Sequence, residues 1–269
     1  HHRCAGGSAL RSLRRATAEV GAVSRMVGGS LRCLPRFLGT SRKCGMLRQH
    51  TVEQLSRVGG HSVGIVVLVV FVVGAVISMQ IGPLLRNYGV VIMIADVAGI
   101  GFLRELGPML TAVVLSGYAG ASIAAELGTM KVGEEIDALR AMAIDPFLHL
   151  VVPRILACVV MTTCLTAIGD ASGVLGGLAV GTFMMDIDPA AYLAELAWAT
   201  ELSDLVSGLA KAVMFGAIVG GIACRFGLAV RGGADAVGRA ATRTIVWSIV
   251  TLILADLLFT IGFYAIRFG

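Results

Sequence analysis

The residues in this chain that could act chemically are charged side chains inside long apolar runs. A charge at the centre of a membrane helix costs roughly 2.5–3.5 kcal/mol on insertion scales, so such residues persist where they pair or line a polar path. These residue types support binding and conduction: an arginine can hold a phosphate, and a carboxylate can hold a proton or a cation. The residues are Asp96, Arg104, Glu105, Glu126, Asp170, Lys211 and Asp256.

Arg104 and Glu105 are the most conspicuous pair, because they directly precede Gly107 and Pro108. Neighbours on a helix point about 100° apart, so the two need not pair with each other. Pro108 has no N–H, which leaves the carbonyl of Arg104 free. The pair is therefore either part of a polar pathway or a structural cluster that holds a kink.

The other buried charges have simpler interpretations. Asp170 and Asp256 are expected to make hydrogen bonds between helices. Lys211 and Glu126 are expected near the membrane interfaces, where long side chains reach toward water.

Catalytic motifs are missing from the sequence. The only lysines are Lys43, Lys131 and Lys211, and none lies in a P-loop motif, so the chain is not expected to bind ATP by itself. There is no H-E-x-x-H or G-x-S-x-G motif, and the six cysteines form no C-x-x-C pair. We therefore predict no enzyme activity, no cofactor, no metal site and no nucleic-acid partner for this chain.

Composition predicts an all-α integral membrane protein. Of 269 residues, 57% are hydrophobic and 14% charged, whereas soluble domains carry roughly 25% charged residues. Aromatic residues make up only 6% and glycines number 35, which favours helices packed closely in lipid over a β-barrel.

Five transmembrane helices are predicted, because about 20 apolar residues cross the hydrocarbon core. Val90–Leu127 is too long for one straight span, so we expect residues 90–106 to form a broken or re-entrant segment. The predicted spans are residues 60–80, 107–127, 155–181, 205–224 and 244–266.

The amino-terminal segment, residues 1–57, is basic, and residues 58–269 form the membrane domain. The segment holds 11 of the 22 Lys and Arg residues against only Glu19 and Glu53. Apolar residues recur between its arginines, which predicts an interfacial helix on an anionic membrane surface. An organelle transit peptide is the alternative, and His1-His2 is given no function.

Charge also predicts the topology. The basic amino-terminal segment, the loop between Lys131 and Arg140 and the loop between Arg225 and Arg243 should share the cytoplasmic side. The segment 182–204 carries five acids and no Lys or Arg, so it should lie outside. Five spans satisfy this distribution and six do not.

Small residues predict where the helices pack. Glycines recur every four residues along the third span, and Gly in a helix interior costs about 1 kcal/mol relative to Ala, so such a stripe indicates close helix contact. The predicted packing residues are Gly117, Gly120, Gly169, Gly173, Gly177 and Gly181.

A short charged amphipathic segment, residues 134–145, follows the second span. Glu134 and Glu135 favour a helix start, Asp145-Pro146 a stop, and Ile136, Leu139 and Ala143 are expected on one face.

The stretch from Leu103 to Arg154, LRELGPMLTAVVLSGYAGASIAAELGTMKVGEEIDALRAMAIDPFLHLVVPR, resembles the central signature of the MlaE/YrbE permease family. These are membrane subunits of ABC-type lipid transporters that work with MCE-domain proteins, and plastid lipid-import permeases are relatives. The similarity runs from about residue 45 to the end. The sequence has Tyr118 where members often have arginine in a Gly-Arg-x-Gly motif, so no role of that arginine is carried over.

The resemblance implies a phospholipid permease that works as a homodimer with two P-loop ATPase subunits, which bind ATP and Mg, and an MCE-protein assembly. It implies an inner-membrane location, with the plastid inner envelope as the alternative. Arg104 and Glu105 would line the lipid pocket. The coupling helix that seats on the ATPase would comprise Glu134, Glu135, Ile136, Asp137, Leu139, Arg140, Met142 and Asp145.

Two other functions stay open from the sequence. An ion-coupled secondary transporter would use Asp96, Glu105, Asp170 or Asp256 as its ion site, although no paired repeat is visible between the two halves. A scaffold for the MCE assembly that transports nothing would not need Arg104 and Glu105.

Overall fold

The computed structural model describes the backbone of residues 42–268 and the side chains between residues 62 and 265. The described part of the chain contains helices and no strands, as predicted. The amino-terminal segment lies mostly outside it, and residues 42–57 begin the first long helix. The helices are α2 (Arg42–Asn87), α3 (Ile94–Gly101), α4 (Gly107–Leu115), α5 (Ala121–Val132), α6 (Glu135–Ala141), α7 (Val152–Met185), α8 (Pro189–Ala199), α9 (Leu202–Leu228) and α10 (Ala234–Phe268).

Five helical stretches in the described residues are long and apolar enough to cross a membrane, which confirms the predicted number. The first continues through Pro83 to Asn87, whereas the predicted span ended at residue 80. The side chain of Met185 fills the space beside Gly82, so the last turns of α2 pack on the end of α7. The stretches are Ser62–Asn87, Val91–Val132, Phe147–Met185, Leu202–Leu228 and Ala234–Ala265.

The expected broken or re-entrant segment at residues 90–106 is instead the first part of one helical stretch, Val91–Val132. The helix absorbs Pro108 by widening into a π-helical turn at Phe102–Leu106, where the N–H of Gly107 bonds to the carbonyl of Phe102. A second π-helical turn spans Ser116–Gly120. At 1.5 Å per residue these 42 residues extend about 63 Å, well beyond a hydrocarbon core of about 30 Å.

Helices α2 and α7 pack with their backbones in close contact. A Cβ on Gly176 would lie 2.2 Å from the carbonyl oxygen of Phe71, and one on Gly74 would lie 2.2 Å from that of Gly173. Helix α9 approaches α7 in the same way, since a Cβ on Gly216 would lie 2.7 Å from Cα of Val159. Glycine is thus required at these crossings, as small-residue packing in membranes predicts.

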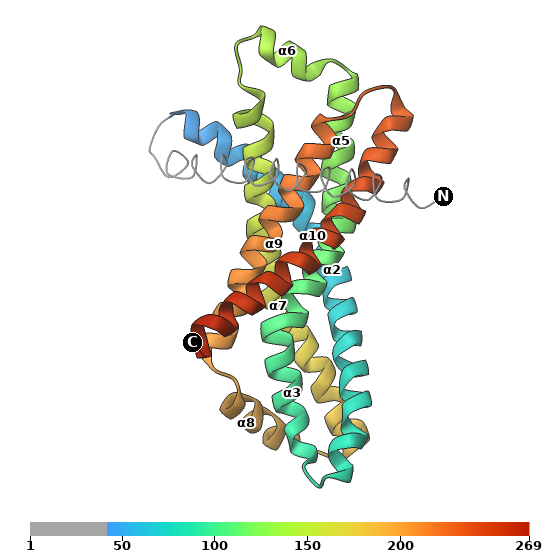
Figure 1. Ribbon diagram of the computed structural model, residues 1–269, viewed down its shortest axis with the longest axis vertical. Helices are drawn as coiled ribbons and strands as arrows, with labels where there is room; N and C mark the ends of the chain where they lie inside the picture. The colour runs from blue at the N-terminus through green and yellow to red at the C-terminus, as the bar shows by residue number, and fades with distance from the viewer. Residues whose placement is uncertain (1–41, 269) are drawn as a thin grey trace, which may run out of the picture.

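The two ends of the bundle differ in their elements (Figure 1). Helix α6 and the loop that joins α9 to α10 lie at one end, where the side chains of Val230 and Val237 pack beside Gly128 of α5. The two basic loops therefore share one end, as the charge distribution predicted.

Helix α8 lies at the opposite end of the bundle, within the acid-rich segment (Figure 1). Asp188 caps its amino terminus by accepting a hydrogen bond from the N–H of Ala191. Tyr192 holds it against Gly177 and Gly181 of α7, and burial raises the pKa of Tyr192 to about 12.

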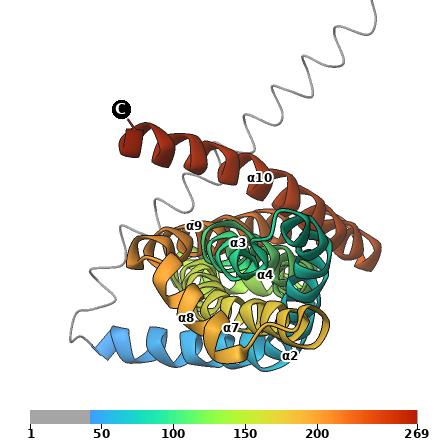
Figure 2. The same cartoon turned by 90° about the horizontal axis from the view of Figure 1, so that it is seen from below.

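Helix α10 lies at the periphery of the bundle, as the end-on view shows (Figure 2). Only 11% of its most apolar window is buried, against 56% for α7 and α9. Its outer face is a continuous apolar surface formed by Val246, Val250, Ile253, Leu254, Leu257, Leu258 and Ile261.

Candidate functional site: a charged cavity within the bundle

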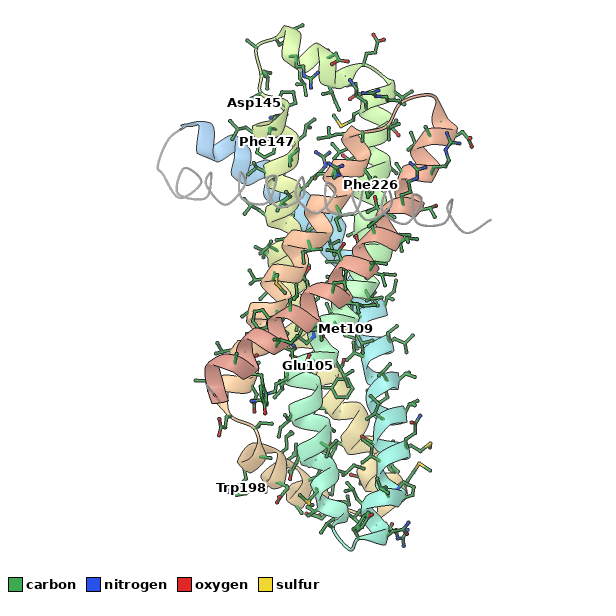
Figure 3. All side chains as sticks on the ribbon, in the orientation of Figure 1. Glu105, Met109, Asp145, Phe147, Trp198 and Phe226 are labelled. Carbon is green, nitrogen blue, oxygen red and sulfur yellow. The ribbon has the colours of Figure 1, made fainter. Side chains whose placement is uncertain are left out.

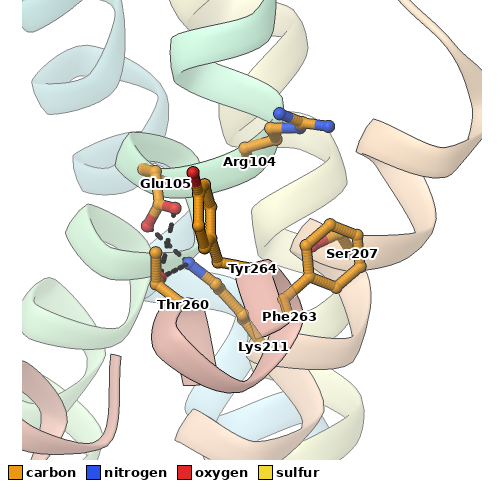
Figure 4. A pocket seen from close by; sticks show the side chains of 7 residues that line it. All are labelled: Arg104, Glu105, Ser207, Lys211, Thr260, Phe263 and Tyr264. Atoms are coloured by element: carbon orange, nitrogen blue, oxygen red, sulfur yellow. Dashed lines mark hydrogen bonds and ion pairs between the residues drawn. The ribbon is translucent and has the colours of Figure 1, made fainter. Parts of the chain in front are cut away.

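A cavity of about 310 Å³ opens between the π-helical turn, α9 and α10. Glu105, which lines it, lies between the α6 end, marked by Asp145, and the α8 end, marked by Trp198, and is nearer to the α8 end (Figure 3). The wall combines charged, hydroxyl and aromatic side chains, so the cavity is amphipathic. It is lined by Arg104, Glu105, Ser207, Lys211, Thr260, Phe263 and Tyr264 (Figure 4).

Lys211 joins two carboxylates from different helices. Its Nζ donates to Oε2 of Glu105 at 2.5 Å and to Oγ1 of Thr260 at 2.9 Å, and forms an ion pair with Oδ1 of Asp256 at 2.9 Å. Thr260 in turn donates to Oε1 of Glu105 at 3.3 Å. The interpretation of Lys211 as a side chain that reaches water at the interface was wrong, because it is only 2% exposed.

Arg104 is held by a second ion pair on the same side of α9. Its Nε donates to Oδ1 of Asp204 at 2.5 Å. Asp204 is fixed by a capping box, in which its Oδ2 also accepts from the N–H of Glu201 at the start of α9. The terminal nitrogens of Arg104 have no hydrogen-bond partner among the described residues.

The local sequence explains why these charges meet. The π-helical turn displaces Arg104 and Glu105 from regular helix positions. Gly208 lets α9 approach this turn closely, since a Cβ there would lie 1.9 Å from the carbonyl oxygen of Leu103. Lys211 and Asp204 are thereby brought within reach of their partners.

Asp170 and Asp96 do not line this cavity. Asp170 packs in the notch left by Gly107. Its Oδ1 has no hydrogen-bond partner among the described residues, so this atom does not make the predicted hydrogen bond between helices. Asp96, in α3, likewise has an unpartnered Oδ1. Asp256 pairs with Lys211 rather than making a simple hydrogen bond between helices.

Glu126 meets a buried arginine near the α6 end of the bundle. Arg154 is 5% exposed, and its Nη2 donates to Oε1 of Glu126 at 2.8 Å, while Nη1 donates to the carbonyl oxygen of Leu150. The pair joins α5 to α7. These are the two helices that carry α6 between them, and the pair was not predicted from the sequence.

Helix α6 is shorter than the predicted segment, since it covers Glu135–Ala141 and leaves Met142 and Asp145 outside. Ile136 is buried and Leu139 is half-buried against the bundle core, as expected of one apolar face. Ala143 departs from the expected face: it is exposed, with a left-handed φ of 57° that takes it out of the helix.

The outward side of α6 is mixed in character. Glu134, Glu135 and Arg140 are exposed, and so are the apolar Met142 and Ile144. Lys131 and Arg140 both pair with Asp137, at 2.9 and 3.0 Å. The hydrogen bond from Lys131 is the largest of the effects that lower the pKa of Asp137.

The predicted packing glycines have several kinds of neighbour. Gly173 accommodates the ring of Phe102, Gly177 and Gly181 accommodate Tyr192, and Gly169 faces Thr111 and Val66. A Cβ on Gly120 would lie 3.3 Å from Val219 of α9. Gly117 meets nothing within 4 Å in the described chain, so it packs against no helix there.

Sequence reasoning missed several residues of the cavity. Asp204 was counted only as part of an acidic loop, and Ser207, Thr260, Phe263 and Tyr264 carried no distinguishing motif. Lys211 could have been found, because a lysine and the carboxylates of Glu105 and Asp256 all lie inside apolar runs and need partners.

Comparison with known proteins identifies the family. The sequence model of the family "Permease MlaE" matches residues 51–261. A probable ABC transporter permease protein of Rickettsia typhi is 39% identical over 209 residues, which cover 78% of this chain and 81% of the relative. A probable ABC transporter permease protein of Synechocystis is 36% identical over 209 residues, covering 78% and 80%.

A plant protein is also similar. The chloroplastic protein TRIGALACTOSYLDIACYLGLYCEROL 1 of Arabidopsis thaliana is 34% identical over 221 residues, which cover 80% of this chain and 62% of the relative. The five apolar helices agree with these matches. The chain therefore belongs to the MlaE permease family and is a multi-pass membrane component of the ABC transporter class rather than a catalytic subunit.

Proposed function

We propose that this chain is the permease subunit of an ATP-driven phospholipid transporter, and that the cavity at Arg104 and Glu105 receives the lipid head group. The observation that carries the proposal is the amphipathic lining of this cavity beside the lipid-facing helix α10. The lining combines the charged side chains of Arg104, Glu105 and Lys211 with the aromatic rings of Phe263 and Tyr264.

A phospholipid fits this arrangement because it has a charged head and apolar chains. The cavity volume of about 310 Å³ is at the lower end of the range for small-molecule sites, which suits a head group better than a whole lipid. The acyl chains would lie against the apolar outer face of α10.

The permease works as a homodimer in this proposal. The poorly buried α10 leaves an apolar face for lipid or a second copy of the chain. An MCE-domain assembly binds at the α8 end, and the protein resides in a bacterial inner membrane or the plastid inner envelope. These partners and locations follow from the family resemblance.

Helix α6 supplies the contact with the ATPase subunits, which bind ATP and Mg. Ile136 and Leu139 anchor it to the bundle, so the outward Glu135, Met142 and Ile144 are the groups available to a partner. The two basic loops at this end agree with a cytoplasmic position by the positive-inside rule.

The lipid assignment is tested by mass spectrometry of lipids that co-purify with the chain in detergent. Wild type should retain phospholipid, and the double variant Arg104→Ala, Glu105→Ala should lose most of it. Phe183→Ala, at the exposed far end of α7, serves as the control. Phospholipid retention that is equal in the double variant and wild type would contradict the assignment of the cavity.

The docking assignment is tested by co-purification of the ATPase subunit. Met142→Glu and Glu135→Lys should weaken it, whereas Met184→Glu, which places the same change at the opposite end of the bundle, should leave it intact. Unchanged co-purification in both α6 variants would refute docking through α6. Leu139→Asp is unsuitable, because Leu139 packs on the core.

An ion-coupled transporter is the second candidate, and the unpartnered Oδ1 atoms of Asp96 and Asp170 are the observation in its favour. It predicts lipid or solute transport that collapses with the ion gradient and persists without ATP. Asp170→Asn would then abolish transport. In the ATP-driven mechanism, transport by proteoliposomes stops when ATP is withheld.

A further inference from the structure

The charges that line the cavity differ in how much of each reaches it. Arg104 and Glu105 are 30% and 41% exposed, whereas their partners Asp204 and Lys211 are 5% and 2% exposed. One cation and one anion therefore face the cavity, and each has its counter-ion behind it in the protein. A ligand in the cavity meets the guanidinium of Arg104 and the carboxylate of Glu105.

The two halves of the cavity wall, one around Arg104 and one around Glu105, have different net charges. Arg104 and Asp204 balance each other. On the other side Lys211 is shared by Glu105 and Asp256, so two carboxylates face one ammonium and one negative charge is in excess. That half attracts a cation, because the ammonium of Lys211 is already engaged by Glu105, Asp256 and Thr260.

The Arg104 half is suited to an anion. Asp204 occupies only Nε, which leaves the two terminal nitrogens without a hydrogen-bond partner among the described residues. A guanidinium presents these nitrogens as a planar fork that matches phosphate oxygens. In Figure 4 the ring of Tyr264 lies between this group and the carboxylate of Glu105.

We infer that the cavity selects phospholipids with a zwitterionic head group, whose phosphate binds Arg104 and whose ammonium binds Glu105, over lipids with a net negative head group. The inference rests on the proposed function and specifies its substrate class. An anionic head group without an ammonium would leave the excess negative charge beside Glu105 and Asp256 uncompensated.

The test is a competition measured by native mass spectrometry on the full chain in detergent. Four dioleoyl lipids are offered at equal concentration: phosphatidylethanolamine, phosphatidylglycerol, diacylglycerol and a cationic trimethylammonium-propane lipid. Wild type should prefer phosphatidylethanolamine over phosphatidylglycerol by about tenfold, as expected for one charge-assisted hydrogen bond. It should also prefer phosphatidylethanolamine over diacylglycerol and the cationic lipid.

Two variants separate the two contacts. Glu105→Gln should reduce the preference for phosphatidylethanolamine over phosphatidylglycerol to about one, because it removes the excess negative charge and the ammonium partner. Arg104→Gln should abolish the preference for phosphatidylethanolamine over the cationic lipid. Glu195→Gln, a carboxylate change on α8, should leave the wild-type pattern.

Each contrary result has a distinct meaning. Phosphatidylglycerol bound as well as phosphatidylethanolamine by wild type, or a ratio that Glu105→Gln does not change, would overturn the zwitterion inference and leave phospholipid binding intact. Preference for the cationic lipid would also overturn it, since the excess negative charge alone would then select the ligand. Binding of no phospholipid would defeat the proposed function itself.

Discussion

Two charge networks in this permease use the same residue types in opposite ways. At the cavity, Glu105, Lys211 and Asp256 lie on three different helices, and Lys211 is almost completely buried. At α6, Lys131, Asp137 and Arg140 lie within ten residues of sequence, and their side chains are 30%, 50% and 64% exposed. A buried cation such as Lys211 depends on its carboxylate partners and so fixes the arrangement of the helices that carry them, whereas exposed pairs contribute little because water screens them.

Removal of the shared lysine should have the largest effect. Lys211→Met leaves two carboxylates without their cation inside the bundle, which should cost about 3–5 kcal/mol of unfolding free energy. Equilibrium unfolding in mixed detergent micelles measures it. The triple variant Lys211→Met, Glu105→Gln, Asp256→Asn should recover most of the loss, and a triple variant as unstable as Lys211→Met would show that packing rather than charge is responsible.

Closing the space at Gly208 should have the next largest effect. A methyl group there would press on the carbonyl of Leu103, so Gly208→Ala should cost about 1–3 kcal/mol and separate Lys211 from Glu105. At Gly133, beside α6, an added Cβ would lie no closer than 3.4 Å to another group, so Gly133→Ala should change the unfolding free energy by less than about 0.5 kcal/mol. Equal losses of unfolding free energy in Gly208→Ala and Gly133→Ala would show that the cavity region is no more tightly packed than the region beside α6.

Arg154 tests whether burial or position in the bundle decides how much a charge contributes to the unfolding free energy, because it lies near the α6 end but is buried. Arg154→Met should cost about 1–3 kcal/mol, less than Lys211→Met, because it leaves one carboxylate that is a third exposed, whereas Lys211→Met leaves two, of which Asp256 is only 18% exposed. Arg140→Met, on the exposed surface of α6, should have almost no effect in the same unfolding assay. Similar values for both arginines would show that burial is not the determinant.

The smallest effect concerns Asp137. Its partners lower its pKa in the folded state below the usual 3.8, so its contribution to stability is present above that pH and is lost as the pH falls through the folded pKa. NMR titration of this carboxylate should give a midpoint below 3.8, and Lys131→Ala should move it upward. A midpoint unaffected by Lys131→Ala would contradict the hydrogen bond from Lys131 to Asp137.

Local sequence predicted the features that depend on short-range pattern. Apolar runs of sufficient length gave five spans, and the distribution of Lys and Arg placed the two basic loops at one end. The spacing of Ile136 and Leu139 identified the buried face of α6. These features follow from the helix period and from the exclusion of charge from lipid, which act within a few turns of chain.

The partners of the buried charges could not be predicted in this way. Lys211 lies 106 residues from Glu105, and Arg154 lies 28 residues from Glu126, so no helical spacing relates them. The π-helical turn before Pro108 also escaped prediction, because a proline permits a break, a kink or a widened turn. Tertiary packing chose among these outcomes.

The sequence by itself determined that this chain is a helical membrane protein with five crossings and an exposed acidic helix between two of them, because hydrophobic length and charge asymmetry are properties of the chain. Only the tertiary structure decided which charge neutralises which. A buried ion pair forms only where helix contacts, such as the approach of α9 at Gly208, bring two side chains within bonding distance.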